Sequence, residues 1–239
     1  MSPSHTATYA PTRPAPQQRT RIKMCGFTRE ADVLAACAVG ADAIGFVLYP
    51  PSPRSVSIER AAELARLLPA FVTPVLLFVN ETPERIEAAC AAVPGALLQF
   101  HGEESADFCQ DMSQRTGRPH LKAARIPLSE VHDFDLLKFA LIHQAAHALL
   151  LDAHVDGYGG GGKTFHWSLL PPNVNAHLVL SGGLTPANVG DGIRALRTHG
   201  LSLAVDVSSG IEAGKGLKDA DKMRQFVQAV RSADNALSF

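Results

Sequence analysis

Three features that would mark a particular class of protein are absent from this chain of 239 residues. The few cysteines form no CxxC pair and are too sparse for a disulfide framework, which indicates free thiols in a reducing compartment. They are Cys25, Cys37, Cys90 and Cys109. Neither charge is in excess, because 22 Lys and Arg offset 23 Asp and Glu to a net charge of -1. No apolar run approaches the roughly 20 residues of a membrane span, and no charged-then-apolar signal peptide opens the chain.

These absences exclude several kinds of partner. A near-neutral chain lacks the basic field that concentrates proteins on DNA or RNA, so we expect no nucleic-acid partner. A local site for a phosphorylated small molecule stays open. We also expect no membrane partner and a cytoplasmic location, while protein partners cannot be inferred from the sequence. Hydrophobic residues at 46% and charged residues at 19% are typical of a globular protein with a sizeable core.

The first 19 residues differ in composition from the rest. They carry Pro3, Pro11, Pro14 and Pro16 and almost no aliphatic side chains. Such a segment buries too little apolar surface to offset chain entropy, so we predict a disordered tail over 1–19. A transit peptide is the alternative, but the prolines would interrupt an amphipathic helix and Arg is scarce. The folded domain is predicted over 20–239.

Short apolar runs alternate with helical patterns along this domain. The predicted strands are 21–25, 43–48, 75–79, 96–100, 120–124, 148–152, 177–181 and 202–207. The predicted helices are 30–39, 57–68, 82–92, 104–116, 128–143, 165–170, 186–198 and 218–232. Strands alternating with helices indicate parallel βαβ units, and eight such units predict a single (β/α)8 barrel. A doubly wound open sheet is the alternative, but no GxGxxG follows the first strand.

Polar residues gather where the predicted strands end, which is where barrels of this kind place their chemistry. Ser181-Gly182-Gly183 precedes a predicted helix, so bare main-chain N–H groups can approach an anion there. Ser208-Ser209-Gly210 follows the next predicted strand and would form the second side of this anion site. We therefore predict a phosphate site in these two loops, although glycine-rich turns can simply reverse the chain.

A glycine-rich loop over 157–162 follows the sixth strand. A surface linker is the simpler interpretation. Lys163, Phe165 and Trp167 come directly after the glycines, and the position at the strand end suits a closing lid, which we favour.

Several blocks together resemble a known family. They are RIKMCGFT, GADAIGFVLYPPSPR, QFHGEE, LLLDAHVDGYGGGGKTFHW, LVLSGGLTPANV and AVDVSSGIEAGKGLKD, spread over about 20–234. In this order they resemble phosphoribosylanthranilate isomerase of tryptophan biosynthesis. The departures, at Met24, Phe27, Phe100 and Gly161, remove no reactive group, and the proline-rich tail is not part of the family pattern.

The resemblance implies an Amadori rearrangement of N-(5-phosphoribosyl)anthranilate, with Cys25 as general base and Asp152 as general acid. One group must protonate the ring oxygen and the other must remove the C2' proton, so their protonation states must differ. Lys23 and Arg54 are candidate cations for stabilising a thiolate. Asp152 ends the apolar run ALLLD, where desolvation favours the protonated acid. An isolated Cys is more often a small core residue, and an Asp after a strand is often a helix cap.

The resemblance also implies four substrate-binding residues. Arg54 matches the position that holds the anthranilate carboxylate or its neighbourhood, with a surface residue as the alternative. Asp206 matches the position near the anthranilate amine, with a structural Asp satisfied by its barrel neighbours as the alternative. Gln99 and His101 lie in the matching QxHGE block, where His101 is equally suited to a structural hydrogen bond. No His/Cys cluster has metal-ligand spacing, and the reaction needs no metal or redox cofactor.

Other functions stay open at this point. One is a different sugar-phosphate barrel, such as an epimerase, a thiamine-phosphate synthase-like transferase or the histidine-pathway isomerase. The last is expected to use two carboxylates, whereas this chain offers a Cys and an Asp. The other is a barrel without catalysis, which the presence of both Cys25 and Asp152 disfavours.

Overall fold

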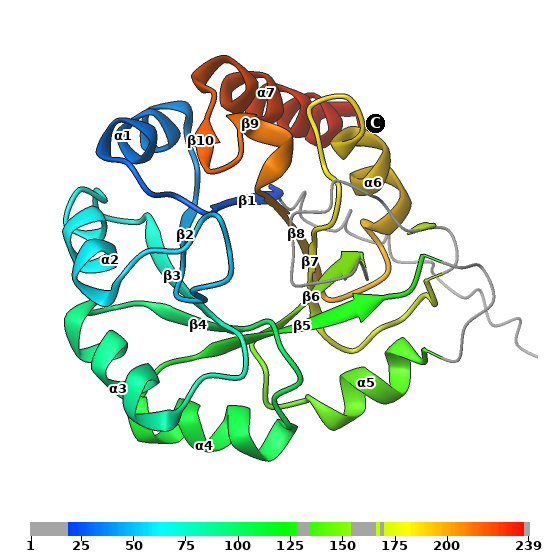
Figure 1. The fold of residues 1–239 in the computed structure, drawn as a ribbon. Helices are drawn as coiled ribbons and strands as arrows, with labels where there is room; N and C mark the ends of the chain where they lie inside the picture. The colour runs from blue at the N-terminus through cyan, green and yellow to red at the C-terminus, as the bar shows by residue number, and fades with distance from the viewer. Residues whose placement is uncertain (1–18, 129–133, 154–165, 168–169, 237–239) are drawn as a thin grey trace, which may run out of the picture.

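The computed structural model describes residues 19–128, 134–153, 166–167 and 170–236. Eight parallel strands follow one another around a closed barrel, in which β1 also pairs with β8 (Figure 1). They are β1 (Arg21–Cys25), β2 (Ala43–Val47), β3 (Thr73–Phe78), β4 (Leu97–Phe100), β5 (His120–Ile126), β6 (Ala148–Ala153), β7 (His177–Leu180) and β8 (Ser202–Val207). The predicted barrel is confirmed, because an open sheet would leave β1 and β8 as unpaired edges.

Helices surround this ring of strands (Figure 1). Those described are α1 (Glu30–Val39), α2 (Ile58–Ala65), α3 (Pro83–Ala92), α4 (Ala106–Thr116), α5 (Leu136–Ile142), α6 (Val189–Leu196) and α7 (Ala220–Ala236). Ser57, Thr82 and Ser105 begin three of them, and each side chain accepts a hydrogen bond from the main-chain N–H three residues on. Gly40 ends α1 and Gly117 ends α4, both in the left-handed conformation that glycine adopts readily at a C-cap.

Two apolar layers hold the barrel together. The larger layer lies between strands and helices, and the smaller one fills the barrel interior with Leu121, Ala123, Leu150 and Val179 among others. Alternation along each strand sends neighbouring side chains to different layers. Above the inner layer, at the carboxyl ends of the strands, polar side chains lie beside a third, small apolar cluster of Cys25, Val47, Leu77 and Val79.

Besides the helix expected from 104, which begins at Ala106 after its Ser105 cap, three predicted helix starts differ from the structure by two residues or more. The helix expected over 128–143 begins only at Leu136, where the Asp135 side chain accepts from the Lys138 N–H. The helix expected from 186 begins at Val189. The third, expected from 218, begins at Ala220, because a small hairpin of β9 (Glu212–Gly214) and β10 (Leu217–Lys218) occupies the preceding residues.

Some predictions fall outside the described residues. These include the tail apart from Arg19, which forms an ion pair with Asp42, and the whole glycine loop over 157–162. Lys163 and Phe165 also fall outside, as do residues 168–169, so half of the helix predicted over 165–170 is not described. The lid therefore stays a prediction. The start of the barrel domain is bound to α7, because the Thr20 N–H and hydroxyl both donate to the Asp234 carboxylate.

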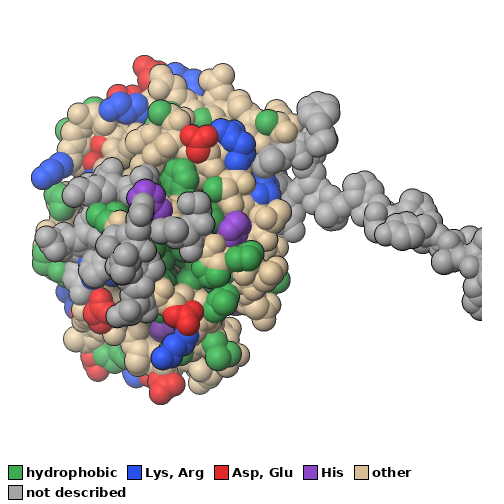
Figure 2. Space-filling model, turned by 90° about the vertical axis from the view of Figure 1, so that its right-hand side faces the viewer, with side chains coloured by type: hydrophobic (Ala, Val, Ile, Leu, Met, Phe, Trp, Pro, Cys, Tyr) green, Lys and Arg blue, Asp and Glu red, His purple; other side chains and the backbone are tan. Residues whose placement is uncertain are grey.

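The surface agrees with the balanced composition. In Figure 2, Lys and Arg side chains are interspersed with Asp and Glu, and neither sign forms a continuous area. None of the helices in the described part is long and apolar enough to cross a membrane.

Candidate active site

A cavity opens at the carboxyl ends of the strands, where the polar strand-end residues had been predicted to meet. Every predicted site residue except Gly210 lines it. The full lining is Cys25, Val47, Tyr49, Ser52, Arg54, Leu77, Val79, Gln99, His101, Asp152, Ser181, Gly182, Gly183, Leu184, Asp206, Val207, Ser208 and Ser209. Residues far apart in sequence thus form one concave site.

Cys25 lies at the end of β1 in a tight, largely apolar corner. It packs with Val47, Leu77 and Val79. On β2 its register partner is Gly45, where an added Cβ would lie 2.6 Å from the Cys25 sulfur. Glycine at this position therefore leaves room for the thiol. Burial raises the pKa of the Cys25 thiol.

A buried ion pair lies beside the thiol. The Lys23 ammonium donates to Asp206 Oδ1 at 2.7 Å, and both side chains are only 6% exposed. Lys23 also interacts with Cys25 and acts against the rise in its pKa, as does Lys218. Lys23 therefore acts in the direction we expected of it, but burial has the larger effect, and the pKa of the thiol is raised overall.

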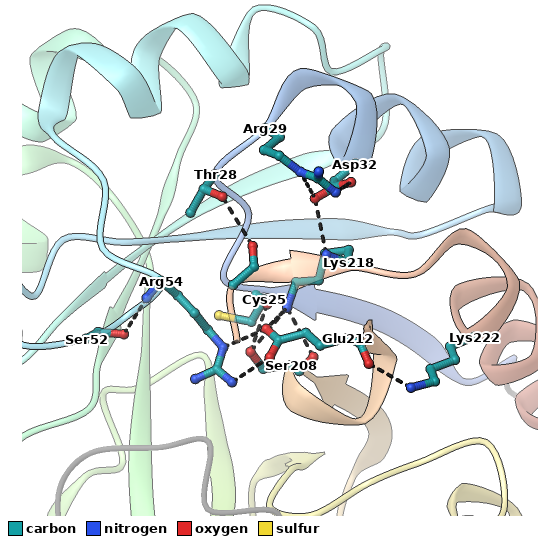
Figure 3. Close-up of polar contacts among 11 residues, drawn as sticks. Cys25, Thr28, Arg29, Asp32, Ser52, Arg54, Ser208, Glu212, Lys218 and Lys222 are labelled. Carbon is teal, nitrogen blue, oxygen red and sulfur yellow. Dashed lines mark hydrogen bonds and ion pairs between the residues drawn. The ribbon is translucent and has the colours of Figure 1, made fainter. Parts of the chain in front are cut away.

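A second set of buried charges holds Arg54 in place (Figure 3). Arg54 donates from Nε and Nη2 to the two carboxylate oxygens of Glu212, at 2.7 and 2.8 Å. Lys218 donates to the same carboxylate at 2.8 Å and to the Ser208 carbonyl at 3.0 Å. Gly26 makes room for this arrangement, because a Cβ there would lie 2.5 Å from Arg54 Cδ. The network fixes the guanidinium beside Cys25.

The opposite wall carries Asp152 at the end of β6. His101 Nε2 lies 2.9 Å from Asp152 Oδ2, and His101 Nδ1 lies 3.0 Å from Gln99 Nε2. The amide nitrogen of Gln99 can only donate, so Nδ1 accepts and Nε2–H donates to Asp152. Gln99 and His101 therefore orient the carboxyl group through a buried chain of hydrogen bonds.

The two loops predicted for phosphate meet at another part of the cavity. Gly182 and Gly183 both have positive φ, 74° and 64°. Within the described part of the chain, the main-chain N–H groups of these two glycines make no hydrogen bond. Consecutive left-handed residues with free N–H groups form a concave site that suits an anion. Ser208 and Ser209 line the same cavity.

Gly210 has a different place. A Cβ on Gly210 would lie 1.9 Å from the Leu184 carbonyl oxygen, so this glycine lets the loop after β8 pack on the loop after β7. It shapes the site from behind and does not line the cavity.

Several residues of the site carried no signal strong enough for us to assign them a role. Glu212 and Lys218 follow β8, the last strand of the barrel. They reach the site only because the β9–β10 hairpin, on which they lie, folds back over it. Gly45 carried a usable signal, since an isolated glycine inside an apolar strand indicates a close approach. Ser181, whose hydroxyl donates to Asp206 Oδ2 at 3.1 Å, was taken only as part of a turn.

The other cysteines take no part in this site. Cys37, Cys90 and Cys109 lie on α1, α3 and α4, and burial raises the pKa of the Cys109 thiol to about 12. Among the described residues, no group of three or more His, Cys, Asp or Glu side chains is placed to hold a metal ion.

Comparisons with known proteins agree with one another. The family model for N-(5'phosphoribosyl)anthranilate (PRA) isomerase matches residues 22–229. An N-(5'-phosphoribosyl)anthranilate isomerase from Leptothrix cholodnii is 58% identical over 216 residues, which cover 90% of this chain and 93% of that protein. The crystal structure of phosphoribosyl anthranilate isomerase from Thermotoga maritima is 40% identical, with a TM-score of 0.78 over 89% of this chain and 99% of that one.

A further solved structure bears on the ligand. It is a phosphoribosyl anthranilate isomerase in complex with reduced 1-(o-carboxyphenylamino)-1-deoxyribulose 5-phosphate. It is 38% identical, with a TM-score of 0.75, and the match covers 89% of this chain and 99% of that one.

Proposed function

Because the chain belongs to the N-(5'-phosphoribosyl)anthranilate isomerase family, we propose that it converts N-(5-phosphoribosyl)anthranilate into 1-(2-carboxyphenylamino)-1-deoxyribulose 5-phosphate. This aldose–ketose isomerisation is an intramolecular oxidation and reduction in L-tryptophan biosynthesis. The family predicted from the sequence blocks is thereby confirmed. The roles of individual residues are the part that this proposal adds.

The observation that carries the mechanism is the placement of Cys25 and Asp152 in one cavity. They end β1 and β6, two strands on different sides of the barrel (Figure 1), and both line the space between. A substrate held in this space exposes one side to a thiol and the other to a carboxyl group. The rearrangement requires such a division, because its acid and its base act at different atoms.

The reaction then proceeds through ring opening by the acid, proton removal by the base, and tautomerisation to the ketone. Asp152 gives its proton to the furanose ring oxygen, the bond from that oxygen to C1' breaks, and the nitrogen lone pair forms an iminium. The Cys25 thiolate removes the C2' proton, and the C2'–H electron pair moves toward the nitrogen to give an enolamine. Loss of the O2' proton and gain of a proton at C1' yield the ketone. All these steps are proton transfers, so the chemistry needs no metal or redox cofactor.

Substrate recognition uses the remaining residues. Arg54 has Nη1 left over from its two bonds to Glu212, and this group binds the anthranilate carboxylate. The N–H groups of Gly182 and Gly183, with Ser208 and Ser209, bind the phosphate. Gln99 and His101 contact the sugar while orienting Asp152. Asp206 lies in the lining on the side of Cys25 and faces the anthranilate amine.

The test is turnover by the purified protein. The anthranilate substrate is fluorescent and its disappearance can be followed continuously, with the labile substrate generated freshly in the assay. We expect efficient turnover, and a folded protein that leaves the fluorescence unchanged would reject the proposal. The free thiols among the described cysteines also suit the reducing cytoplasm, where we propose that the protein works.

A further inference from the structure

We propose that Lys23 is a positioning residue for the catalytic base, because its ammonium, fixed by Asp206, supplies the positive charge that stabilises the Cys25 thiolate. This inference rests on the proposed role of Cys25. It gives Lys23 a part in the reaction, and it gives Asp206 a task besides contacting the substrate.

Strand geometry places the three groups together. Ile22 and Met24 on β1 point to the outer apolar layer, so Lys23 and Cys25 point to the barrel interior. Asp206 is the register partner of Lys23 on β8 and lies on the same face. Its carboxylate accepts from Lys23 through Oδ1 at 2.7 Å and from Ser181 through Oδ2 at 3.1 Å. Oδ1 thus holds the ammonium, while the bond from Ser181 to Oδ2 fixes the orientation of the carboxylate.

Stability alone does not account for this ion pair. Two charges that are each 6% exposed lose most of their hydration, and an apolar pair of similar size would often serve the fold as well. The inner layer directly below is apolar, with Leu121, Leu150 and Val179. Lys23 therefore lies above this apolar layer, on the same face of β1 as Cys25, where its charge can stabilise a thiolate.

The other charges around the thiol are tied to different partners. Facing Cys25 are Lys23 on β1, Asp206 on β8, Lys218 on β10 and Arg54 in the loop after β2, while β2 itself contributes Gly45. Lys218 and Arg54 share the Glu212 carboxylate. Lys23 opposes the rise in the Cys25 pKa more strongly than Lys218 does, whereas Asp206 adds to that rise to a smaller extent than Lys23 opposes it. Lys23 is the cation with the greatest influence on the base.

The proton balance is simple. The Cys25 thiol releases its proton to water and becomes a thiolate beside the ammonium, while Lys23 keeps its own proton throughout. The thiolate then takes the C2' proton of the substrate and is again a thiol. The ammonium stabilises the charged thiolate and not the neutral thiol. Removing it therefore lowers the fraction of Cys25 that is present as the active base.

The test measures the thiol directly, without substrate. The rate of iodoacetamide alkylation is followed against pH, and peptide mass spectrometry resolves Cys25 from the other cysteines. In Lys23→Met we expect the midpoint for Cys25 to rise by about one pH unit or more, which lowers the thiolate fraction at neutral pH about tenfold. The value of kcat/KM at neutral pH falls by the same factor. Arg21→Met, which removes an exposed charge from the same strand, leaves the midpoint unchanged.

A second variant guards against loss of the fold. Lys23→Met leaves the Asp206 carboxylate buried without its cation, so Lys23→Met/Asp206→Asn is made as well. Asp206 itself raises the pKa of the Cys25 thiol, so a smaller upward shift is expected in this double variant. A folded variant of either kind with the parent midpoint would overturn the proposal, even if its activity or stability is reduced. Absence of turnover in the parent protein would instead refute the proposed function, and the alkylation midpoints would still decide the role of Lys23.

Discussion

The fit between Gly45 and Cys25 predicts that one added methyl group disables the enzyme. In Gly45→Ala the new Cβ would lie 2.6 Å from the Cys25 sulfur and 3.1 Å from its Cα. Nonbonded carbon contacts favour about 3.5–4.0 Å, so the sulfur must move by roughly 1 Å. A misplacement of about 1 Å can cost roughly 100-fold in rate, and we expect a fall in kcat of about that size.

Stability should change much less than activity. The side chain of Cys25 can rotate away, but the contact with its Cα remains and forces β1 and β2 slightly apart. Overpacking of this kind costs about 1–3 kcal/mol. For a chain of this length each kcal/mol lowers Tm by about 2–4 °C, so the variant stays folded at assay temperature.

The assay compares kcat and Tm with a matched glycine. Gly214→Ala is the control, because a Cβ at that position meets nothing within 4 Å and its φ is not positive. We expect the control to retain the parent kcat and Tm. If Gly45→Ala also keeps the parent kcat, the position of the Cys25 sulfur is not critical and the base must be another group.

Three further results are expected. Asp152→Asn should lower kcat at least about 100-fold with product affinity largely kept, since Asn keeps the contact to His101 but gives up no proton; lost binding at unchanged kcat would contradict this. Gly183→Val, at a φ of 64° that a branched side chain avoids, should raise KM at least about tenfold and abolish competition by inorganic phosphate, whereas equal inhibition of both proteins would place the phosphate elsewhere. Burial lowers the pKa of His120 and His143 to about 4 from 6.5, so unfolding takes up protons in this window and stability falls as the pH drops through it. Tm should therefore depend less on pH in His143→Gln than in the parent, and equal slopes would argue against the assignment.

The barrel was predictable because its local signals agree. Each buried strand is a short apolar run, and helix starts such as Ser57 and Thr82 carry their own capping side chains. The start of α6 was misplaced because a side chain decides it. Asn188 accepts from the Thr185 N–H and donates to the Gly183 carbonyl, which closes a turn ahead of α6 and delays the helix.

The site was predictable only in part. Residues at strand ends could be found from their position, because parallel strands bring their carboxyl ends to one side. The partners that hold them could not, since the pairing of Arg54 with Glu212 depends on how the β9–β10 hairpin folds back. Gly210 was predicted to bind phosphate because it follows Ser208 and Ser209 in the sequence. Its close approach to Leu184 could not be predicted, because it arises only when the loops after β7 and β8 pack together.

The most direct test of the mechanism is the kcat of Cys25→Ser on the anthranilate substrate at neutral pH. A serine hydroxyl is far less acidic than a thiol and supplies no ready anion, so we predict a kcat at least about 100-fold below that of the parent protein. The variant should remain folded, because serine is close to cysteine in size. Near-normal turnover by Cys25→Ser would contradict the account, since the group that removes the C2' proton could not then be the thiol.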